Sequence, residues 1–157
     1  MTFMHKVKGK VNVGVVGGYR CSKAVYKIAE ELGSLIANEG WVLVCGGGSG
    51  VMEAACRGAK SKGGLTVGIL PSYDGHEANR YLDVKIPTGL GYARNVLVVR
   101  ASDIIIAVDG KYGTLSEISF ALNEGKTVVG IETWDIKGVI KVKNPRAAIN
   151  YIKKRVT

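Results

Sequence analysis

Apolar residues along the chain fall into two kinds of segment: short runs rich in β-branched residues, and longer stretches with an apolar position every three or four residues. The short runs predict buried β-strands, and the longer stretches predict amphipathic helices. Glycine or proline stands at most junctions and favours turns there. We expect strands at residues 10–16, 41–45, 65–70, 82–86, 103–108 and 127–131, and helices at 22–38, 51–61, 92–101, 114–123 and 144–155.

The strands are almost continuously apolar instead of alternating between apolar and polar positions, which is typical of a parallel sheet covered on both faces. Their alternation with helices predicts a Rossmann-like, doubly wound parallel sheet in a three-layer α/β/α arrangement. A length of 157 residues suits a single domain spanning 1–157. Residues 71–81 are polar and rich in turn formers, so we expect a mobile surface loop there, in a position to act as a lid.

The formal net charge of +9 raises the alternative of a nucleic-acid-binding protein. The excess cations lie in residues 1–10 and 136–157, which contain no Asp or Glu. Basic, solvated chain ends explain this distribution, so we do not expect a nucleic-acid partner. No apolar run approaches the about 20 residues of a membrane span and no signal segment opens the chain, so we expect a cytoplasmic protein without membrane contact.

The three cysteines, Cys21, Cys45 and Cys56, are odd in number and have no CxxC spacing, so the sequence predicts no disulfide framework. The two histidines, His5 and His76, are far apart and have no cysteine at ligand spacing, so we expect no metal site. Cys21 precedes a predicted helix, where a thiol pKa can fall. No base accompanies it, and we assign it a structural role.

Ligands of doubly wound sheets bind where the strands end and the next helices begin. Two glycine-bearing loops fall at that edge. The first contains Gly17 and Gly18 before a helix that Ser22 can cap, and it is either an amide site for a phosphate or ribose or an ordinary turn. In the second loop, the absence of side chains allows either the close approach of a ligand, which we favour, or close packing. This loop comprises Gly46, Gly47, Gly48, Ser49 and Gly50.

A third loop at the same edge leads into the helix predicted to begin at residue 114. It offers free amides, a hydroxyl and a cation with the helix dipole behind them, which suits a phosphate. Glu117 has two interpretations, as the partner of Thr114 in a capping box or as a functional carboxylate. The residues expected to bind ligand here are Gly110, Lys111, Tyr112, Gly113 and Thr114.

Arg94 stands near the start of its predicted helix, where the positive end of the helix dipole disfavours a cation. A ligand anion or a carboxylate would offset that cost. Arg100 lies about 240° further round the helix, so the two arginines cannot face one site. Arg94 is therefore the candidate.

Together these motifs resemble the family formerly described as possible lysine decarboxylases, which includes the LONELY GUY phosphoribohydrolases that activate cytokinins and the molybdenum cofactor carrier proteins. The resemblance covers residues 10–132. Residues 46–52 resemble the family's GGGxxGxM loop, residues 110–117 resemble PGGxGTxxE, and the stretch from Arg94 to Asp103 also matches. No motif points to a pyridoxal phosphate lysine, so decarboxylation is not expected.

In the hydrolase branch, the resemblance implies that a glycine-rich loop binds the 5′-phosphate of a nucleoside monophosphate while Arg94 and Glu117 act at the N-glycosidic bond, with no cofactor. The chain departs from that pattern: Asp109 replaces the motif's proline, Lys111 its second glycine, and Asn95 the lysine after the arginine. Cysteine also replaces the first glycine of the GGGxxGxM loop. These departures resemble the cofactor-carrier branch.

Two functions are therefore expected. The first is a nucleotide-binding protein similar to nucleoside 5′-monophosphate phosphoribohydrolases, with Arg94 and Glu117 catalytic and Asn95 among the ligand-binding residues. The alternative is a non-catalytic carrier of the molybdenum cofactor or of another phosphorylated ligand. The family resemblance also implies a homo-oligomer, a dimer or tetramer, with sites near the subunit boundaries.

Overall fold

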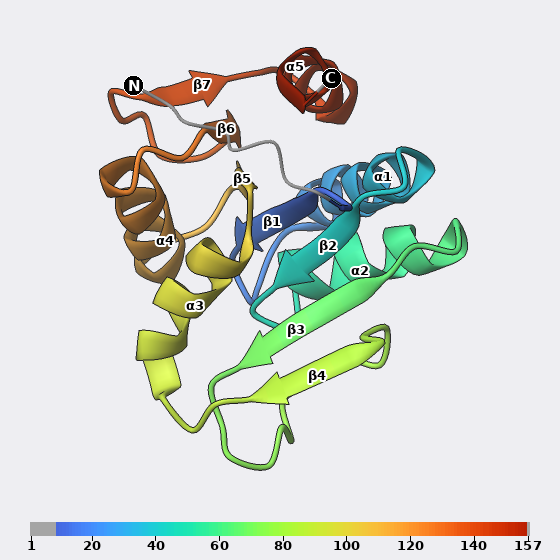
Figure 1. The fold of residues 1–157 in the computed structure, drawn as a ribbon, viewed down its shortest axis with the longest axis vertical. Helices are drawn as coiled ribbons and strands as arrows, with labels where there is room; N and C mark the ends of the chain where they lie inside the picture. The colour runs from blue at the N-terminus through green and yellow to red at the C-terminus, as the bar shows by residue number, and fades with distance from the viewer. Residues whose placement is uncertain (1–8, 157) are drawn as a thin grey trace.

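The computed structural model describes residues 9–156. Within them, helices cover both faces of one parallel sheet (Figure 1). The strands are β1 (Asn12–Gly17), β2 (Val42–Cys45), β3 (Thr66–Leu70), β4 (Val84–Pro87), β5 (Ile104–Val108), β6 (Val128–Ile131) and β7 (Val139–Lys141). The helices are α1 (Lys23–Asn38), α2 (Val51–Ser61), α3 (Arg94–Ala101), α4 (Tyr112–Asn123) and α5 (Pro145–Val156), with a short 3₁₀ helix, η1 (Gly91–Ala93), before α3.

The strand order is β4-β3-β2-β1-β5-β6-β7. The chain starts in the middle of the sheet, builds outward to β4, and then returns to the other side of β1. Apolar residues of α1, α2 and α5 form one core layer, and those of α3 and α4 form the other. The predicted three-layer, doubly wound fold is confirmed, and its direction reverses between β1 and β5, where such sheets bind ligands.

The central strands are buried on both faces, as their sequences predict. Val13 and Val15 of β1 face the layer of α1, α2 and α5, and Val16 faces the opposite layer. All five residues of β5 are buried, and each face receives β-branched side chains. A strand of this kind has no solvent face, which explains why its apolar run shows no alternation.

Helices α1 and α2 cross at two glycines. A Cβ atom on Gly33 would lie 1.9 Å from the carbonyl oxygen of Ala55, and one on Gly58 would lie 1.8 Å from that of Glu30. The hydroxyl of Ser34 donates to the Gly58 carbonyl oxygen at 3.1 Å in the same contact. The backbones therefore approach more closely than any side chain larger than hydrogen allows.

The C-terminal part of the chain belongs to the fold, which corrects the expectation that its basic residues mark merely a solvated end. Strand β7 extends the sheet and was not predicted, because three residues are too few to give a pattern. Helix α5 buries Ala148, Ile149 and Ile152 while its lysines stay exposed. Lys6 and Lys8 lie outside the described residues. Among residues 9–156, no helix is long and apolar enough to cross a membrane.

Candidate functional site

The loops after β1, β2 and β5 meet at the carboxyl edge of the sheet, as expected. The Val51 amide donates to the carbonyl oxygen of Gly18 at 3.0 Å, and the Ser49 hydroxyl donates to that of Tyr19 at 2.7 Å. A Cβ atom on Gly18 would lie 3.8 Å from the Cα of Gly110. Ser22 caps α1 by accepting from the Val25 amide at 3.1 Å. The three loops thus form one continuous surface.

Close packing accounts for several glycines of these loops. A Cβ on Gly17 would lie 2.5 Å from the Val51 side chain, and one on Gly47 would lie 2.4 Å from that of Leu70. Gly50 adopts φ +64°, and its Cβ would lie 2.3 Å from the Gly18 carbonyl oxygen. The alternative of close packing therefore explains these three positions, whereas a Cβ on Gly113 would meet only the Asn95 side chain, at 3.9 Å.

Asn79 forms hydrogen bonds to the backbone of the loop of residues 46–50. The Asn79 side chain is 6% exposed, and its Nδ2 donates to the carbonyl oxygen of Gly48 at 2.9 Å. The Asn79 amide donates to the carbonyl oxygen of Gly47 at 2.9 Å. The polar loop 71–81, expected as a mobile surface segment, is thus anchored to the glycine loop at this point.

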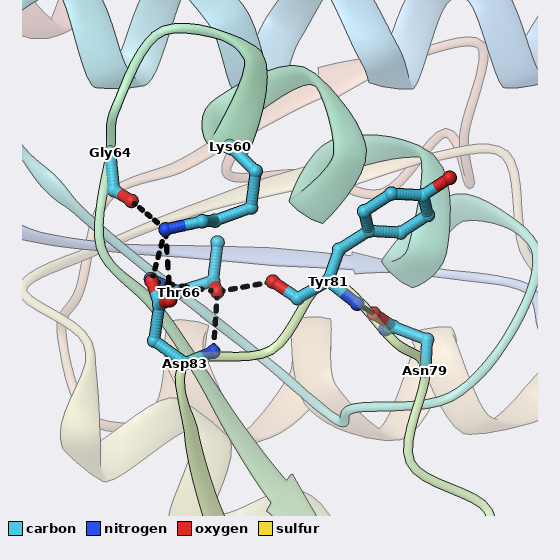
Figure 2. Close-up of polar contacts among 6 residues, drawn as sticks. All are labelled: Lys60, Gly64, Thr66, Asn79, Tyr81 and Asp83. Atoms are coloured by element: carbon cyan, nitrogen blue, oxygen red, sulfur yellow. Dashed lines mark hydrogen bonds and ion pairs between the residues drawn. The ribbon is translucent and has the colours of Figure 1, made fainter.

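Figure 2 shows the hydrogen bonds and the ion pair that join the segment from Asn79 to Asp83 to β3 and α2. Asp83 accepts from the Thr66 amide at 3.0 Å and pairs with Lys60 of α2 at 2.8 Å. The Thr66 hydroxyl donates to the Tyr81 carbonyl oxygen at 2.6 Å, and the Asn79 Oδ1 accepts from the Tyr81 amide at 3.0 Å. This network fixes the glycine loop to β3 and α2. The sequence gives no signal for it, because its members are scattered polar residues.

Arg94 begins α3, two residues after the predicted start, and its guanidinium reaches the ends of neighbouring strands. Its Nε donates to the carbonyl oxygen of Ile69 at 3.0 Å, its Nη2 donates to that of Gly46 at 3.4 Å, and its Nη1 donates to the Asn95 Oδ1. Arg100 instead pairs with Glu124 at 3.0 Å on the outer surface. The prediction that the two arginines face different sites is confirmed.

Asn95 is in the first turn of α3, and its side chain contacts α4. Its side chain is 3% exposed, and its Nδ2 donates to the Ser116 hydroxyl at 3.1 Å. That hydroxyl donates to the carbonyl oxygen of Gly113 at 2.6 Å. Asn95 therefore joins Arg94 to the first turn of α4.

Helix α4 begins at Tyr112, two residues before the predicted start, which removes the capping box from consideration. Lys111 occupies the N-cap position, and no side chain caps the helix there. Thr114 is already inside the helix, and Glu117 is buried, with 6% exposure. Burial raises the pKa of Glu117 to about 8, and the nearby Arg94 guanidinium opposes this rise. The carboxyl group is therefore mostly protonated at neutral pH.

The backbone before α4 has an unusual geometry at Asp109, which adopts φ +50°. Proline, fixed near φ −65°, cannot take this conformation. The hydroxyl of Thr133 donates to the Asp109 carbonyl oxygen at 2.7 Å, and the Trp134 indole donates to that of Lys111 at 2.9 Å. Thr133 and Trp134 follow β6, and no sequence pattern identified them as parts of the site.

One further thiol and one cluster of potential metal ligands bear on chemistry. Burial, with a smaller contribution from Asp109, raises the pKa of Cys21, so the helix start does not activate this thiol. Asp74, His76 and Glu77 bring potential metal-ligand atoms within 4.8 Å of one another. The His76 ring contacts the Asp74 carboxylate at 2.7 Å, and Glu77 accepts from the Ser72 hydroxyl, so hydrogen bonds within the loop account for them.

Known structures that resemble this one include two molybdenum cofactor proteins. The molybdenum cofactor binding protein of Rippkaea orientalis has a TM-score of 0.91 and 40% identity, covering 96% of this chain and 99% of its own. The molybdenum cofactor carrier protein of Chlamydomonas reinhardtii has a TM-score of 0.84 and 35% identity, covering 92% of this chain and 98% of its own.

A characterised enzyme is also similar over the central part of the chain. The cytokinin riboside 5′-monophosphate phosphoribohydrolase of Mycobacterium tuberculosis is 33% identical over 117 residues, which are 69% of this chain and 63% of the enzyme. The model of the SLOG cluster4 family matches residues 10–155. With the three-layer fold and the three loops at one edge, this match shows that the chain belongs to the SLOG cluster4 family.

Proposed function

We propose that this protein binds the molybdenum cofactor, a phosphorylated pterin, and carries it without altering it. The observation that supports this most directly is the correspondence with the two molybdenum cofactor proteins over nearly the full length of all three chains. The similarity to the Mycobacterium tuberculosis hydrolase covers only 63% of that enzyme.

The N-terminus of α4 supports phosphate binding. The first amides of a helix have no acceptor within it, and no side chain caps α4. Gly113 is exposed, and a Cβ atom there would meet only the Asn95 amide nitrogen, at 3.9 Å. The exposed Lys111 and the helix dipole add positive charge. A phosphate oxygen can therefore approach the Gly113 amide, with Arg94 connected to this turn through Asn95 and Ser116.

The state of Glu117 disfavours an anionic role for it at a glycosidic bond and suits a binding role. A carboxylate that stabilises a developing ribosyl cation must be ionised. With a pKa raised to about 8 by burial, Glu117 stays mostly neutral near neutral pH and can both donate and accept hydrogen bonds. Such a group suits the mixed donors and acceptors of a pterin ring.

The second candidate function is hydrolysis of a nucleoside 5′-monophosphate to a base and ribose 5-phosphate. The influence of Arg94 on the pKa of Glu117 supports it by placing the two near each other, because the resemblance to that branch gives these residues the catalytic roles. A protonated Glu117 could deliver its proton to the departing base. Asp109 and Lys111 distinguish the loop of this chain from the hydrolase motif.

The two functions are separated by loading and turnover experiments. Molybdenum cofactor released from a donor protein is incubated with the purified chain, and the bound pterin is measured by fluorescence after oxidation. We expect the cofactor to be retained and recovered unchanged. Arg94→Ala removes about 2 kcal/mol of charge-assisted hydrogen bonding and weakens binding about 30-fold, whereas Arg100→Ala, at the exposed pair with Glu124, leaves it unchanged.

A panel of nucleoside 5′-monophosphates is tested with the same preparation for release of free base. We expect none at high protein concentration. Release of a base that Glu117→Gln abolishes, together with failure to retain the cofactor, would overturn the carrier proposal in favour of the hydrolase.

We also propose that the protein is a homo-oligomer. All four residues of the edge strand β4 are exposed, and Val84 and Ile86 lie on the same face of it. Helices α3 and α4 expose Leu97 and Phe120. Sedimentation velocity should give a mass above that of one chain, and Val84→Lys should lower it if β4 contributes to the interface.

A further inference from the structure

Two buried thiols are in contact directly behind the glycine loop. Cys45 is the last residue of β2, and Cys56 lies in α2. Both are fully buried, and their Sγ atoms are 3.6 Å apart. A disulfide has an S–S distance of about 2.05 Å, so an approach of ~1.5 Å separates this contact from a covalent bond.

The thiol pair shares hydrogen-bond partners with the glycine loop. The Gly47 amide donates to the Cys45 Sγ at 3.3 Å. The Asn79 side chain lies near enough to Cys56 to affect its pKa, and it donates to the Gly48 carbonyl oxygen at 2.9 Å. A movement of the Cys45 sulfur therefore acts directly on the backbone of residues 46–50.

The surroundings of the pair make its two members unequal. The hydrogen bond between the two thiols lowers the pKa of Cys45, and the Gly47 amide and the Arg94 guanidinium lower it further, while burial opposes them. The same hydrogen bond and burial raise the pKa of Cys56. The hydrogen bond from the Gly47 amide stabilises a thiolate at Cys45, and thiolates are the reactive species in disulfide exchange.

We propose that Cys45 and Cys56 form a reversible disulfide that changes the conformation of the glycine loop. The oxidant is a low-molecular-weight disulfide such as oxidised glutathione. The Cys45 thiolate attacks one sulfur of the oxidant, breaking its S–S bond and releasing one thiol. The deprotonated Cys56 then attacks the Cys45 sulfur and releases the second thiol. The two cysteines lose two electrons and two protons, which the oxidant gains as it becomes two thiols.

Burial makes this reaction depend on the loop. Because neither thiol is exposed, the oxidant reaches Cys45 only when the surrounding structure opens locally, and the Gly47 amide makes residues 46–50 part of those surroundings. Once the disulfide forms, the Cys45 sulfur moves toward Cys56 and away from the Gly47 amide. The oxidised loop therefore loses a hydrogen bond that orders it in the reduced protein.

The first test uses the wild-type chain and no ligand. The protein is incubated with oxidised glutathione, free thiols are alkylated, and peptides are mapped by mass spectrometry. We expect a Cys45–Cys56 bridge with Cys21 alkylated, reversal by dithiothreitol, and faster amide hydrogen exchange at residues 46–50 in the oxidised form. Alkylated Cys45 and Cys56, or a glutathione adduct that never resolves into a bridge, would overturn the proposal.

Variants supply matched controls. We expect the Cys21→Ser variant to form the bridge and to show the faster hydrogen exchange. We expect Cys45→Ser and Cys56→Ala each to abolish both the bridge and the change in hydrogen exchange. A change in hydrogen exchange that persists in Cys56→Ala would show that the loop responds to another oxidation and would contradict the assignment. Because the wild-type experiment needs no variant, a variant that fails to fold does not remove the test.

A second measurement, which rests on the proposed function, compares binding of the molybdenum cofactor to the reduced and oxidised proteins. We expect about tenfold weaker binding after oxidation, equivalent to ~1.4 kcal/mol. Equal binding by both forms, with the bridge in place, would refute control of ligand affinity. Absence of cofactor binding in either form, with the bridge and the hydrogen exchange change present, would contradict the proposed function and leave the disulfide site supported.

Discussion

Replacing Glu117 with glutamine gives the sharpest test of the electrostatics of the site. Glutamine has nearly the shape of a protonated glutamic acid and cannot ionise, so the variant keeps the packing and removes the titration. The wild-type carboxyl has a pKa raised from 4.5 to about 8 because it is buried. The folded state therefore holds a proton that the unfolded chain releases near pH 4.5.

The sign and size of the effect follow from that difference. Below pH 4.5 the carboxyl is protonated in both states, and the burial of Glu117 carries no charge penalty. Between pH 4.5 and about pH 8 the folded state binds more protons than the unfolded state, so the free energy of unfolding falls as pH rises. At about 1.4 kcal/mol for each pH unit, the free energy of unfolding falls by ~5 kcal/mol across this pH range.

Urea unfolding from about pH 4 to about pH 9 measures this difference. Glu117→Gln should match the wild type at the acid end and exceed its free energy of unfolding by several kcal/mol above pH 8. The control is Glu31→Gln, which changes an exposed carboxylate on α1 and should leave the wild-type pH dependence in place. Parallel pH profiles for the wild type and Glu117→Gln would refute a buried, neutral Glu117.

Other substitutions test the backbone and the anchor of the loop. Asp109→Gly should raise the free energy of unfolding by about 0.5 to 1 kcal/mol by relieving φ +50°, whereas Asp109→Pro should lower it by ~3 kcal/mol; urea midpoints measure both. Gly33→Ala should cost ~3 kcal/mol or more in thermal unfolding, because its Cβ would overlap the Ala55 carbonyl oxygen. Asn79→Ala should cost about 1 to 2 kcal/mol and speed hydrogen exchange at residues 46–50; unchanged exchange there would argue against its anchoring role.

The periodic parts of the chain carried enough information to predict the layers of the fold. Buried strands such as β5 and the apolar face of α1 are long and regular, so their type and order follow from hydrophobic spacing. Strand β7 was missed because only Val139 among its three residues is buried. Its pairing depends on β6, which sequence spacing does not reveal.

The candidate site could be predicted in part. Glycine-rich loops and the position of Arg94 are visible in the sequence because they stand at strand ends and a helix start. The state of Glu117 is not visible, because the Thr114–Glu117 spacing fits a capping box equally well until the helix start is known. Tertiary contacts settle this point: α4 begins at Tyr112, and its next turn buries Glu117.

The close crossing of α1 and α2 also affects the loops that precede the N-termini of both helices. Each helix starts directly after one ligand-site loop, α1 after the loop that contains Gly18 and α2 after the loop that ends at Gly50. The two helices are in backbone contact at Gly33 and Gly58, and the loops before them are in contact at Gly18 and Gly50, so the pair is held at two places along its length. Two residues without side chains therefore help to hold together two loops of the candidate site, although both lie inside helices and away from those loops.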